Sequence, residues 1–239
     1  MNPSPEQSPG PPLPLYQASP HPCPYLPDRT AVNEFTVVRS VEPTVYQSLM
    51  DAGFRRSADV IYRPICDGCR ECIPIRVPVD RFVPSRSQRR VRRKNLDVEM
   101  TLGPPACTDE KWRIFAAYLQ HQHDGAMGDS REELEGFLYQ SPTSTQEMVY
   151  RIDDAVVAVG LVDVTPAALS SVYFYFDPAH ARRSLGILGA LCEIDECRRR
   201  ALPYWYIGYY IHECGRMNYK ASFRPCELLH PDGAWRPMD

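Results

Sequence analysis

The sequence lacks the features of a membrane or exported protein. None of its 239 residues lie in a stretch that approaches the roughly 20 consecutive apolar residues needed to span a bilayer. The first residues have neither the basic region nor the apolar region of a secretion signal. These absences exclude a membrane span and favour a cytoplasmic location.

The cysteines lack the pattern of a disulfide framework, which is typical of small secreted chains. There are nine of them, and Cys66, Cys69 and Cys72 lie within seven residues of one another. Clustered thiols in a cytoplasmic chain indicate metal or redox chemistry, although the two separated CxxC pairs of a typical zinc site are absent. Cys23 is our candidate for a fourth ligand of zinc or an iron–sulfur cluster, with His21 as its alternative. Reduced, partly buried thiols are the other interpretation.

Acidic residues are missing from one stretch of the chain. The net charge is −3, but residues 1–95 carry 14 Lys and Arg against 9 Asp and Glu, whereas residues 96–239 carry 13 against 21. Residues 81–95 contain no acid and are predicted to be helical after Pro84. Such a segment is suited to phosphate contacts with a nucleic acid, the alternative being a solvated helix face. Its candidate tRNA-contacting residues are Arg86, Arg89, Arg90, Arg92, Arg93 and Lys94.

Proline and glycine divide the chain into three regions. Residues 1–27 hold ten of the 24 prolines, and we predict that residues 1–22 are a disordered tail. A break at residues 103–105 separates a predicted domain at 23–105 from a second one at 106–239. Pro74 and Pro78 should confine the strand between them to a sheet edge. The second region alternates strand and helix patterns, which indicates a mixed α/β layer.

A strand at residues 172–176 is expected to lead through a loop into a helix at residues 184–200. The loop carries His180, Arg182 and Arg183, and the free N–H groups of a helix N-terminus bind anions. This arrangement fits a coenzyme A pyrophosphate, but the glycine-rich loop that acyltransferases use for it is absent. A phosphate of a tRNA terminus is the alternative anion.

A second strand, at residues 204–211, is rich in tyrosine. Alternation should place Trp205, Ile207 and Tyr209 on one face and Tyr206 and Tyr210 on the other. Four tyrosine hydroxyls need polar partners, so one face is expected to line a cleft, unless the strand lies in an aromatic core. Downstream of this strand, two basic residues could bind a carboxylate: Lys220 and Arg224.

Taken together, these segments resemble the arginyl-tRNA–protein transferase family, and within it the bacterial aspartate/glutamate leucyltransferase branch. The matching segments appear in the family's order and cover most of residues 23–229. They are residues 46–64, 66–77, 81–95, 170–178, 184–195 and 204–229.

The resemblance implies an α+β fold: an N-terminal cysteine-containing domain followed by a mixed α/β domain like that of GCN5-related acyltransferases. It also implies transfer of leucine from Leu-tRNA to proteins that begin with Asp or Glu, which marks them for degradation. Arginyl transfer from Arg-tRNA is the alternative within the family. The ester of a charged tRNA is already activated, so we expect no cofactor to be required for catalysis, and we expect a monomer.

Our hypothesis for the site assigns three tasks. The basic helix grips the tRNA acceptor stem, and the turn formed by Ser184, Leu185 and Gly186 receives the terminal adenosine or its phosphate. The expected catalytic residues around the ester are Tyr175, Asp177, Tyr210 and His212, with His212 or Asp177 as the base. The residues expected to hold the acidic side chain of the target are Arg55, Arg56, Lys220 and Arg224.

Two interpretations from other classes stay open. A non-enzymatic, metal-stabilised RNA-binding protein would bind tRNA whether or not it is charged. A coenzyme A-dependent N-acetyltransferase would bind acetyl-coenzyme A, and the missing glycine-rich loop counts against it.

Overall fold

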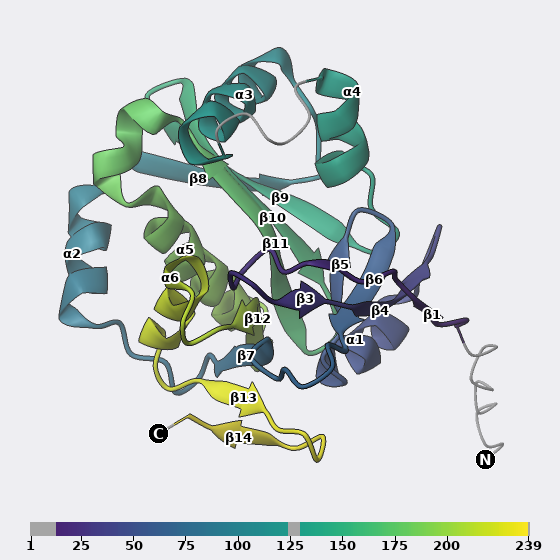
Figure 1. Cartoon of the computed structure of the whole chain (residues 1–239). Helices are drawn as coiled ribbons and strands as arrows, with labels where there is room; N and C mark the ends of the chain where they lie inside the picture. Colours follow the sequence, from purple (N-terminus) through teal and green to yellow (C-terminus); the bar gives the residue numbers. More distant parts are fainter. Residues whose placement is uncertain (1–12, 124–129, 239) are drawn as a thin grey trace, which may run out of the picture.

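The computed structural model describes residues 13–123 and 130–238, with the side chains of 122 and 123 left out. An eight-stranded sheet forms the body of the molecule (Figure 1). Its spatial order is β14-β13-β7-β12-β11-β10-β9-β8, and only β11 and β12 run parallel among the pairs. The strands are β7 (Ile73–Pro78), β8 (Val98–Gly103), β9 (Thr145–Ile152), β10 (Ala155–Val164), β11 (Ala168–Phe176), β12 (Tyr204–Tyr210), β13 (Glu227–Leu229) and β14 (Trp235–Pro237).

Helices cover both faces of this sheet. On one face, α5 (Leu185–Arg199) buries Leu188, Leu191 and Ile194 against the sheet, and α2 (Arg86–Lys94) packs beside α5. On the other face lie α3 (Asp109–His123), the short α4 (Arg131–Leu134) and the π-helical turn η1 (Glu135–Tyr139). The predicted mixed α/β architecture is therefore confirmed.

A smaller sheet and helix α1 (Pro43–Asp51) cover the rest of that second face (Figure 1). The four strands of this small sheet have the order β1-β4-β6-β5. They are β1 (Tyr16–Gln17), β4 (Asn33–Val37), β5 (Arg55–Ser57) and β6 (Val60–Pro64), and a separate pair is formed by β2 (His21–Pro22) and β3 (Thr30–Ala31).

The start of the described chain differs from the predicted tail. Residues 1–12 lie outside the described part, but residues 13–22 contain β1 and β2, so the prediction of disorder to residue 22 is wrong there. Tyr16 pairs with Phe35 in the ladder, with ring centroids 5.9 Å apart. Aromatic contact and strand pairing thus order a segment that its prolines alone would leave extended.

The sheet is shared across the predicted boundary near residue 105. Both β7 and β8 precede that boundary, yet β7 lies between β12 and β13 and β8 forms the far edge. The prediction that proline confines β7 to an edge is wrong. Pro74 and Pro78 stand near the strand ends, and β13 pairs only with Ile75 and Arg76, so the missing N–H groups remove no bond to β13.

A buried ion pair joins the two sheets. The Arg56 guanidinium on β5 donates from Nε and from a terminal nitrogen to the two carboxylate oxygens of Asp163 on β10, each at 2.8 Å. Both side chains are completely buried, and the Thr145 hydroxyl also bonds to Asp163. The prediction that Arg56 holds a target's acidic side chain is therefore wrong, because an internal carboxylate already occupies it.

Replacing Arg56 with Ala should lower the free energy of unfolding by about 3–5 kcal/mol, because the Asp163 carboxylate would be left buried and unpaired. Urea denaturation measures this loss. The matched control is Arg236→Ala, which removes an ion pair with Asp232 at the surface and should lower the free energy of unfolding far less, because water already solvates both charges. An equal loss of unfolding free energy in the two variants would contradict the claim that burial makes the loss of the Arg56–Asp163 pair more costly.

Candidate active site

The central feature of the site is a separation of two neighbouring strands in the middle of the large sheet. β11 and β12 pair only at Ala168↔Tyr204, Leu169↔Trp205 and Ser170↔Tyr206. β11 then continues to Phe176 without further described pairing to β12. We call this separation beyond Ser170 and Tyr206 the strand wedge. On its β11 side, the main chain has no ladder partner from β12 in the described residues, which makes its N–H and C=O groups candidates for substrate contacts.

Irregular backbone lies on both sides of the strand wedge. In β11, the register with β10 shifts between Leu161 and Val162, which makes Val172 an extra residue. In β12, the register with β7 shifts between Tyr206 and Tyr209, and Gly208 has a φ of +93° that a residue with a side chain rarely adopts. Bulges of this kind are common next to active sites because they redirect side chains.

The shift at Gly208 changes which aromatic residues share a face. Trp205, Ile207 and Tyr210 pack in the core under α5. Tyr206 and Tyr209 lie on the opposite side, where the Arg55 guanidinium stands over their rings at 5.1 and 5.7 Å. The expected grouping of Tyr209 with Trp205 is wrong, because the bulge reverses the alternation.

Arg55 is a buried cation with backbone partners. It is 5% exposed, and its terminal nitrogens donate to the carbonyl oxygens of Phe54 (2.8 Å) and Gly208 (3.3 Å). Among the described residues, its Nε finds no hydrogen-bond partner. No carboxylate in residues 13–123 or 130–238 forms an ion pair with it. Burying a guanidinium without an anion costs desolvation free energy. A bound anion would offset that cost, so Arg55 is suited to receive one.

Lys220 is a second buried cation beside Arg55. It lies on the 3₁₀ turn η3 (Tyr219–Ser222), is 8% exposed, and its Nζ donates to the Tyr209 carbonyl oxygen at 2.8 Å. Burial, and next the positive charge of Arg55, lower the pKa of Lys220 to about 7. The structure thus brings together Arg55 and Lys220, two of the residues predicted to hold the target's acidic side chain. They meet beside the Gly208 bulge, where they bond to the Gly208 and Tyr209 carbonyl oxygens.

Arg224 does not join this pair, so its predicted role is not supported. Its side chain is exposed and donates from Nε to the Ala221 carbonyl oxygen at 3.0 Å, and a terminal nitrogen bonds to the carbonyl oxygen of Met238 near the C-terminus. The titratable groups that act on Lys220 are Arg55, Cys214 and Cys72, and Arg224 is not among them.

The predicted catalytic residues divide between the two faces of the sheet. Tyr210 and His212 do meet, with the Tyr210 hydroxyl 3.0 Å from His212 Nδ1. Tyr175, however, is fully buried on the α3 face, where its hydroxyl bonds to that of Tyr139 at 2.7 Å. Placing Tyr175 at the ester is therefore wrong. Asp177 accepts a bond from the Ala179 N–H and caps the 3₁₀ turn η2 (Pro178–Arg183).

The N-terminus of α5 offers only backbone groups to an anion. Ser184 has a left-handed conformation with a φ of 59°, and its side chain does not cap the helix. Leu185 is 1% exposed and belongs to the core, so its side chain cannot contact an adenosine as predicted. Gly186 is exposed and leaves the first turn open. The Ile187 and Leu188 N–H groups bond to the Ser184 carbonyl oxygen, so in the described chain the N–H groups left to a phosphate are those of Leu185 and Gly186.

The predicted basic helix is present as α2, and its first turn explains why it forms. Ser85 and Gln88 make a reciprocal capping box at its start. Arg92 differs from the expectation for a tRNA contact, because it bonds to Asp195 on α5 at 2.7 Å. The exposed cations of the helix are Arg86, Arg89, Arg90, Arg93 and Lys94.

The basic surface of α2 continues toward the start of α5. The Lys94 ammonium donates to the carbonyl oxygen of Arg182, and the Asn95 amide donates to that of Arg183 at 3.0 Å. These bonds hold η2 against the end of α2 (Figure 1). One surface therefore joins a cationic helix to an open helix N-terminus.

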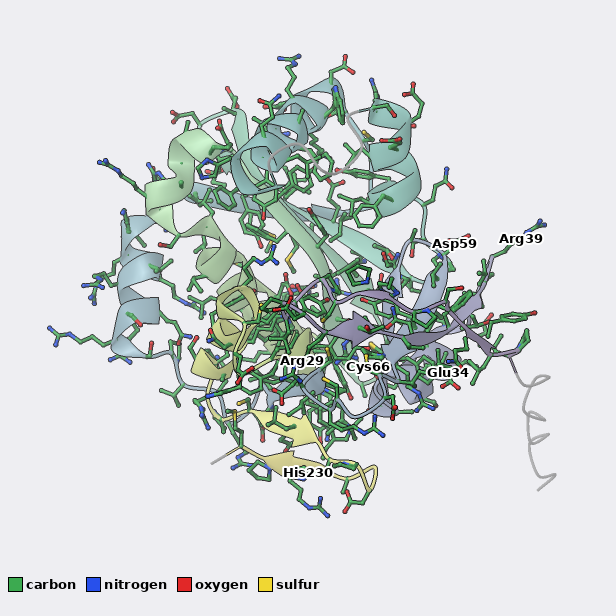
Figure 2. The ribbon with its side chains drawn as sticks, in the orientation of Figure 1. Arg29, Glu34, Arg39, Asp59, Cys66 and His230 are labelled. Carbon is green, nitrogen blue, oxygen red and sulfur yellow. The ribbon has the colours of Figure 1, made fainter. Side chains whose placement is uncertain are left out.

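The four thiols named from the sequence line one pocket of about 460 Å³ beside the N-terminal strands. Figure 2 shows Arg29 and Cys66 on that side of the molecule. Cys66 Sγ accepts the Val32 N–H at 3.4 Å, and Cys69 Sγ accepts a bond from Arg29 at 3.4 Å. Burial raises the pKa of the Cys72 thiol to about 12.

Within the described chain, no three His, Cys, Asp or Glu side chains gather as ligands of one ion. The thiols as arranged here do not fit a closed zinc or iron–sulfur site, and ligation by Cys23, Cys66, Cys69 and Cys72 stays a prediction.

Among the helices of the described residues, none is long and apolar enough to cross a membrane.

Glu193, a buried acid on α5, is not among the residues predicted from the sequence. It is 1% exposed and accepts the Trp205 indole N–H at 2.6 Å. Its burial can be predicted from its spacing. It follows Gly189 by four residues and Leu185 by eight, on the helix face that packs against the sheet.

Two sequence-family models match the chain. "Arginine-tRNA-protein transferase, N terminus" matches residues 21–90, and "Arginine-tRNA-protein transferase, C terminus" matches residues 110–230. Among solved structures, the C-terminal domain of a putative lysylphosphatidylglycerol synthetase from Agrobacterium fabrum is 15% identical, with a TM-score of 0.49 over 81% of this chain and 62% of that one.

Curated relatives match over nearly the whole length. An aspartate/glutamate leucyltransferase of Marinobacter nauticus is 41% identical over 95% of this chain and 96% of that protein. One of Pseudomonas savastanoi pv. phaseolicola is 40% identical over 91% of this chain and 94% of that protein. With these relatives and both family models matched, the chain belongs to the arginine-tRNA-protein transferase family.

Proposed function

We propose that this protein transfers leucine from Leu-tRNA to the N-terminal Asp or Glu of target proteins and so marks them for degradation. The printed names of its relatives support the donor and the acceptor. The observation that carries the acceptor rule is the pair of buried cations, Arg55 and Lys220, which have no carboxylate partner in the described structure.

The side-chain carboxylate of the target's first residue would bind between these two cations. A charge-assisted bond to each would replace backbone contacts that the cations make without substrate. Asn or Gln at the same place would leave two buried charges unpaired, so the site rejects them more strongly than a lost contact alone would suggest.

The donor would bind along the other side of the strand wedge. Phosphates of the acceptor stem meet the exposed cations of α2, and a phosphate of the 3′ end meets the N-terminus of α5. The aminoacyl ester then reaches the strand wedge, where unpaired N–H groups of β11 can bind the oxyanion of the tetrahedral intermediate. This arrangement places donor and acceptor on either side of one gap in the sheet.

The reaction needs neither ATP nor a catalytic metal in this proposal, because the tRNA ester is already activated. The α-amine of the target, once neutral, attacks the ester carbonyl carbon. An amide bond forms, the bond to the ribose oxygen breaks, and that oxygen receives a proton. A cytoplasmic location and action as a monomer belong to the same proposal.

A transfer assay tests the donor and the acceptor together. Purified protein is offered radiolabelled Leu-tRNA, and separately Arg-tRNA, with otherwise identical peptides that begin with Asp, Glu, Asn or Ala. We expect label from Leu-tRNA on the Asp and Glu peptides alone. Label from Arg-tRNA instead would replace the donor, and tRNA binding without transfer to any peptide would contradict the proposal.

Lys220→Met should weaken binding of an Asp-initiated peptide by about 10–100-fold, the loss of one charged hydrogen bond. In the unaltered protein, the Asp-over-Asn preference in Kd should fall as pH rises through about 7, because Lys220 then loses its proton and its charge. In the variant this pH dependence should vanish. Arg224→Gln is the matched control and should keep both the affinity for the Asp-initiated peptide and the pH dependence of the Asp-over-Asn preference. A preference that does not change with pH in either protein would contradict the assignment.

Charge reversal on α2 should abolish tRNA binding and leave the fold intact. The triple variant Arg86→Glu, Arg89→Glu and Arg90→Glu alters exposed side chains that lie outside the core. Because phosphate contacts are electrostatic, affinity of the unaltered protein should also fall steeply with salt. Filter binding and a thermal melt measure the two properties. Unchanged affinity at low and high salt would show that tRNA binds elsewhere.

A further inference from the structure

Glu193 connects the two strands at the point where they separate. Its Oε2 accepts the indole N–H of Trp205 on β12 at 2.6 Å, and its Oε1 lies 3.4 Å from the Ser171 hydroxyl on β11. Ser170 and Tyr206 form the last pair of the β11–β12 ladder, so Ser171 is the first residue of β11 inside the strand wedge. The carboxyl therefore stands at the closed end of the wedge.

This carboxyl is buried beside neutral groups, and the described residues supply it with no counter-ion. Glu193 is 1% exposed, and no Lys, Arg or His in the described part of the chain forms an ion pair with it. The titratable groups that face it are Tyr150 from β9, Tyr219 from η3 and the thiols of Cys192 and Cys197 on its own helix.

Burial raises the pKa of Glu193 to about 7, and the bonds from Trp205 and Ser171 lower it only in part. The free α-amine of a peptide has a pKa of roughly 7.7–8.0. A carboxylate in this range is matched to receive the proton that such an amine must lose before it attacks.

Access to Glu193 runs through Ser171. The Ser171 side chain is partly exposed, whereas Glu193 itself is closed off. The bulge at Val172, in the ladder with β10, follows directly, and beyond Ser170 no pairing of β11 with β12 is described. A group bound in the wedge can therefore reach the Ser171 hydroxyl, which already contacts Oε1.

We propose that Glu193 is a positioning residue that accepts the proton of the attacking amine through Ser171, an inference that rests on the leucyl-transfer function above. The ammonium of the target gives one proton to Ser171 Oγ, whose own proton passes to the Glu193 carboxylate. The neutral nitrogen bonds to the ester carbon, and its second proton goes to the departing ribose oxygen. Glu193 then releases its proton to solvent, so charge and atoms balance.

Glu193→Gln tests this assignment, because the amide keeps the size of the side chain and can still accept the Trp205 N–H. We expect kcat for leucyl transfer to fall by about 100-fold or more, the usual contribution of a proton acceptor. The KM values for Leu-tRNA and for the Asp peptide should not change. In the unaltered protein, kcat should fall below pH 7. In the variant this fall should be absent, while the titration of the peptide's own amine remains.

Two further variants keep the test decisive. Ser171→Ala removes the relay without touching the helix and should lower kcat to a similar extent. Glu196→Gln, on the same helix but paired with Arg199 and Arg200, should keep the kcat profile near pH 7. Unaltered kcat and pH profile in Glu193→Gln or in Ser171→Ala would overturn the inference. Absence of leucyl transfer by the unaltered protein would instead refute the proposed function.

Discussion

The buried bond between Arg56 and Asp163 fixes how the two sheets meet, and the candidate site depends on that joint. Desolvating both charges is costly, and the bidentate geometry, with help from the Thr145 hydroxyl, offsets the cost. Neighbouring residues on a strand point to opposite sides. With Arg56 anchored in β10, Arg55 is directed toward Gly208 and the rings of β12. An internal ion pair thus sets the position of a cation that has no internal partner.

The second constraint is the broken pairing in the middle of the large sheet. A continuous ladder between β11 and β12 would satisfy every main-chain group and leave no room for a substrate. The bulge at Val172 and the left-handed Gly208 end that ladder after three pairs, while α5 connects the two strands from one face. Glu193, Lys220 and Arg55 gather around the two sides of this opening, so the same irregularities that weaken the sheet create the place where chemistry can occur.

Much of the architecture could be predicted from local patterns, whereas the partners of individual side chains could not. The capping box of α2, the aromatic strand β11 and the apolar face of α5 are read from neighbouring residues. Arg56 and Arg55 are adjacent and chemically identical, and only the fold shows that Asp163, 107 residues away, neutralises one of them. The sequence predicts the strand that carries Tyr175, but it does not reveal which face the bulge at Val172 turns inward. Helical spacing indicates that Glu193 is buried, but it does not reveal its bonds to Trp205 and Ser171.

The position of β7 has a consequence for how the molecule can be made. This strand comes from the first third of the chain, yet it separates β12 from the final hairpin of β13 and β14, and Arg76 on β7 bonds to Glu227 on β13 at 2.9 Å. Neither family segment can complete the sheet alone. The N-terminal segment supplies β7, whereas the C-terminal segment supplies both of its neighbours, β12 and β13. On the ribosome, β7 must wait for more than half of the polypeptide before either neighbour exists. The two segments must therefore be inherited together: an exchange of one of them between relatives would have to preserve the fit of a strand in the interior of the other.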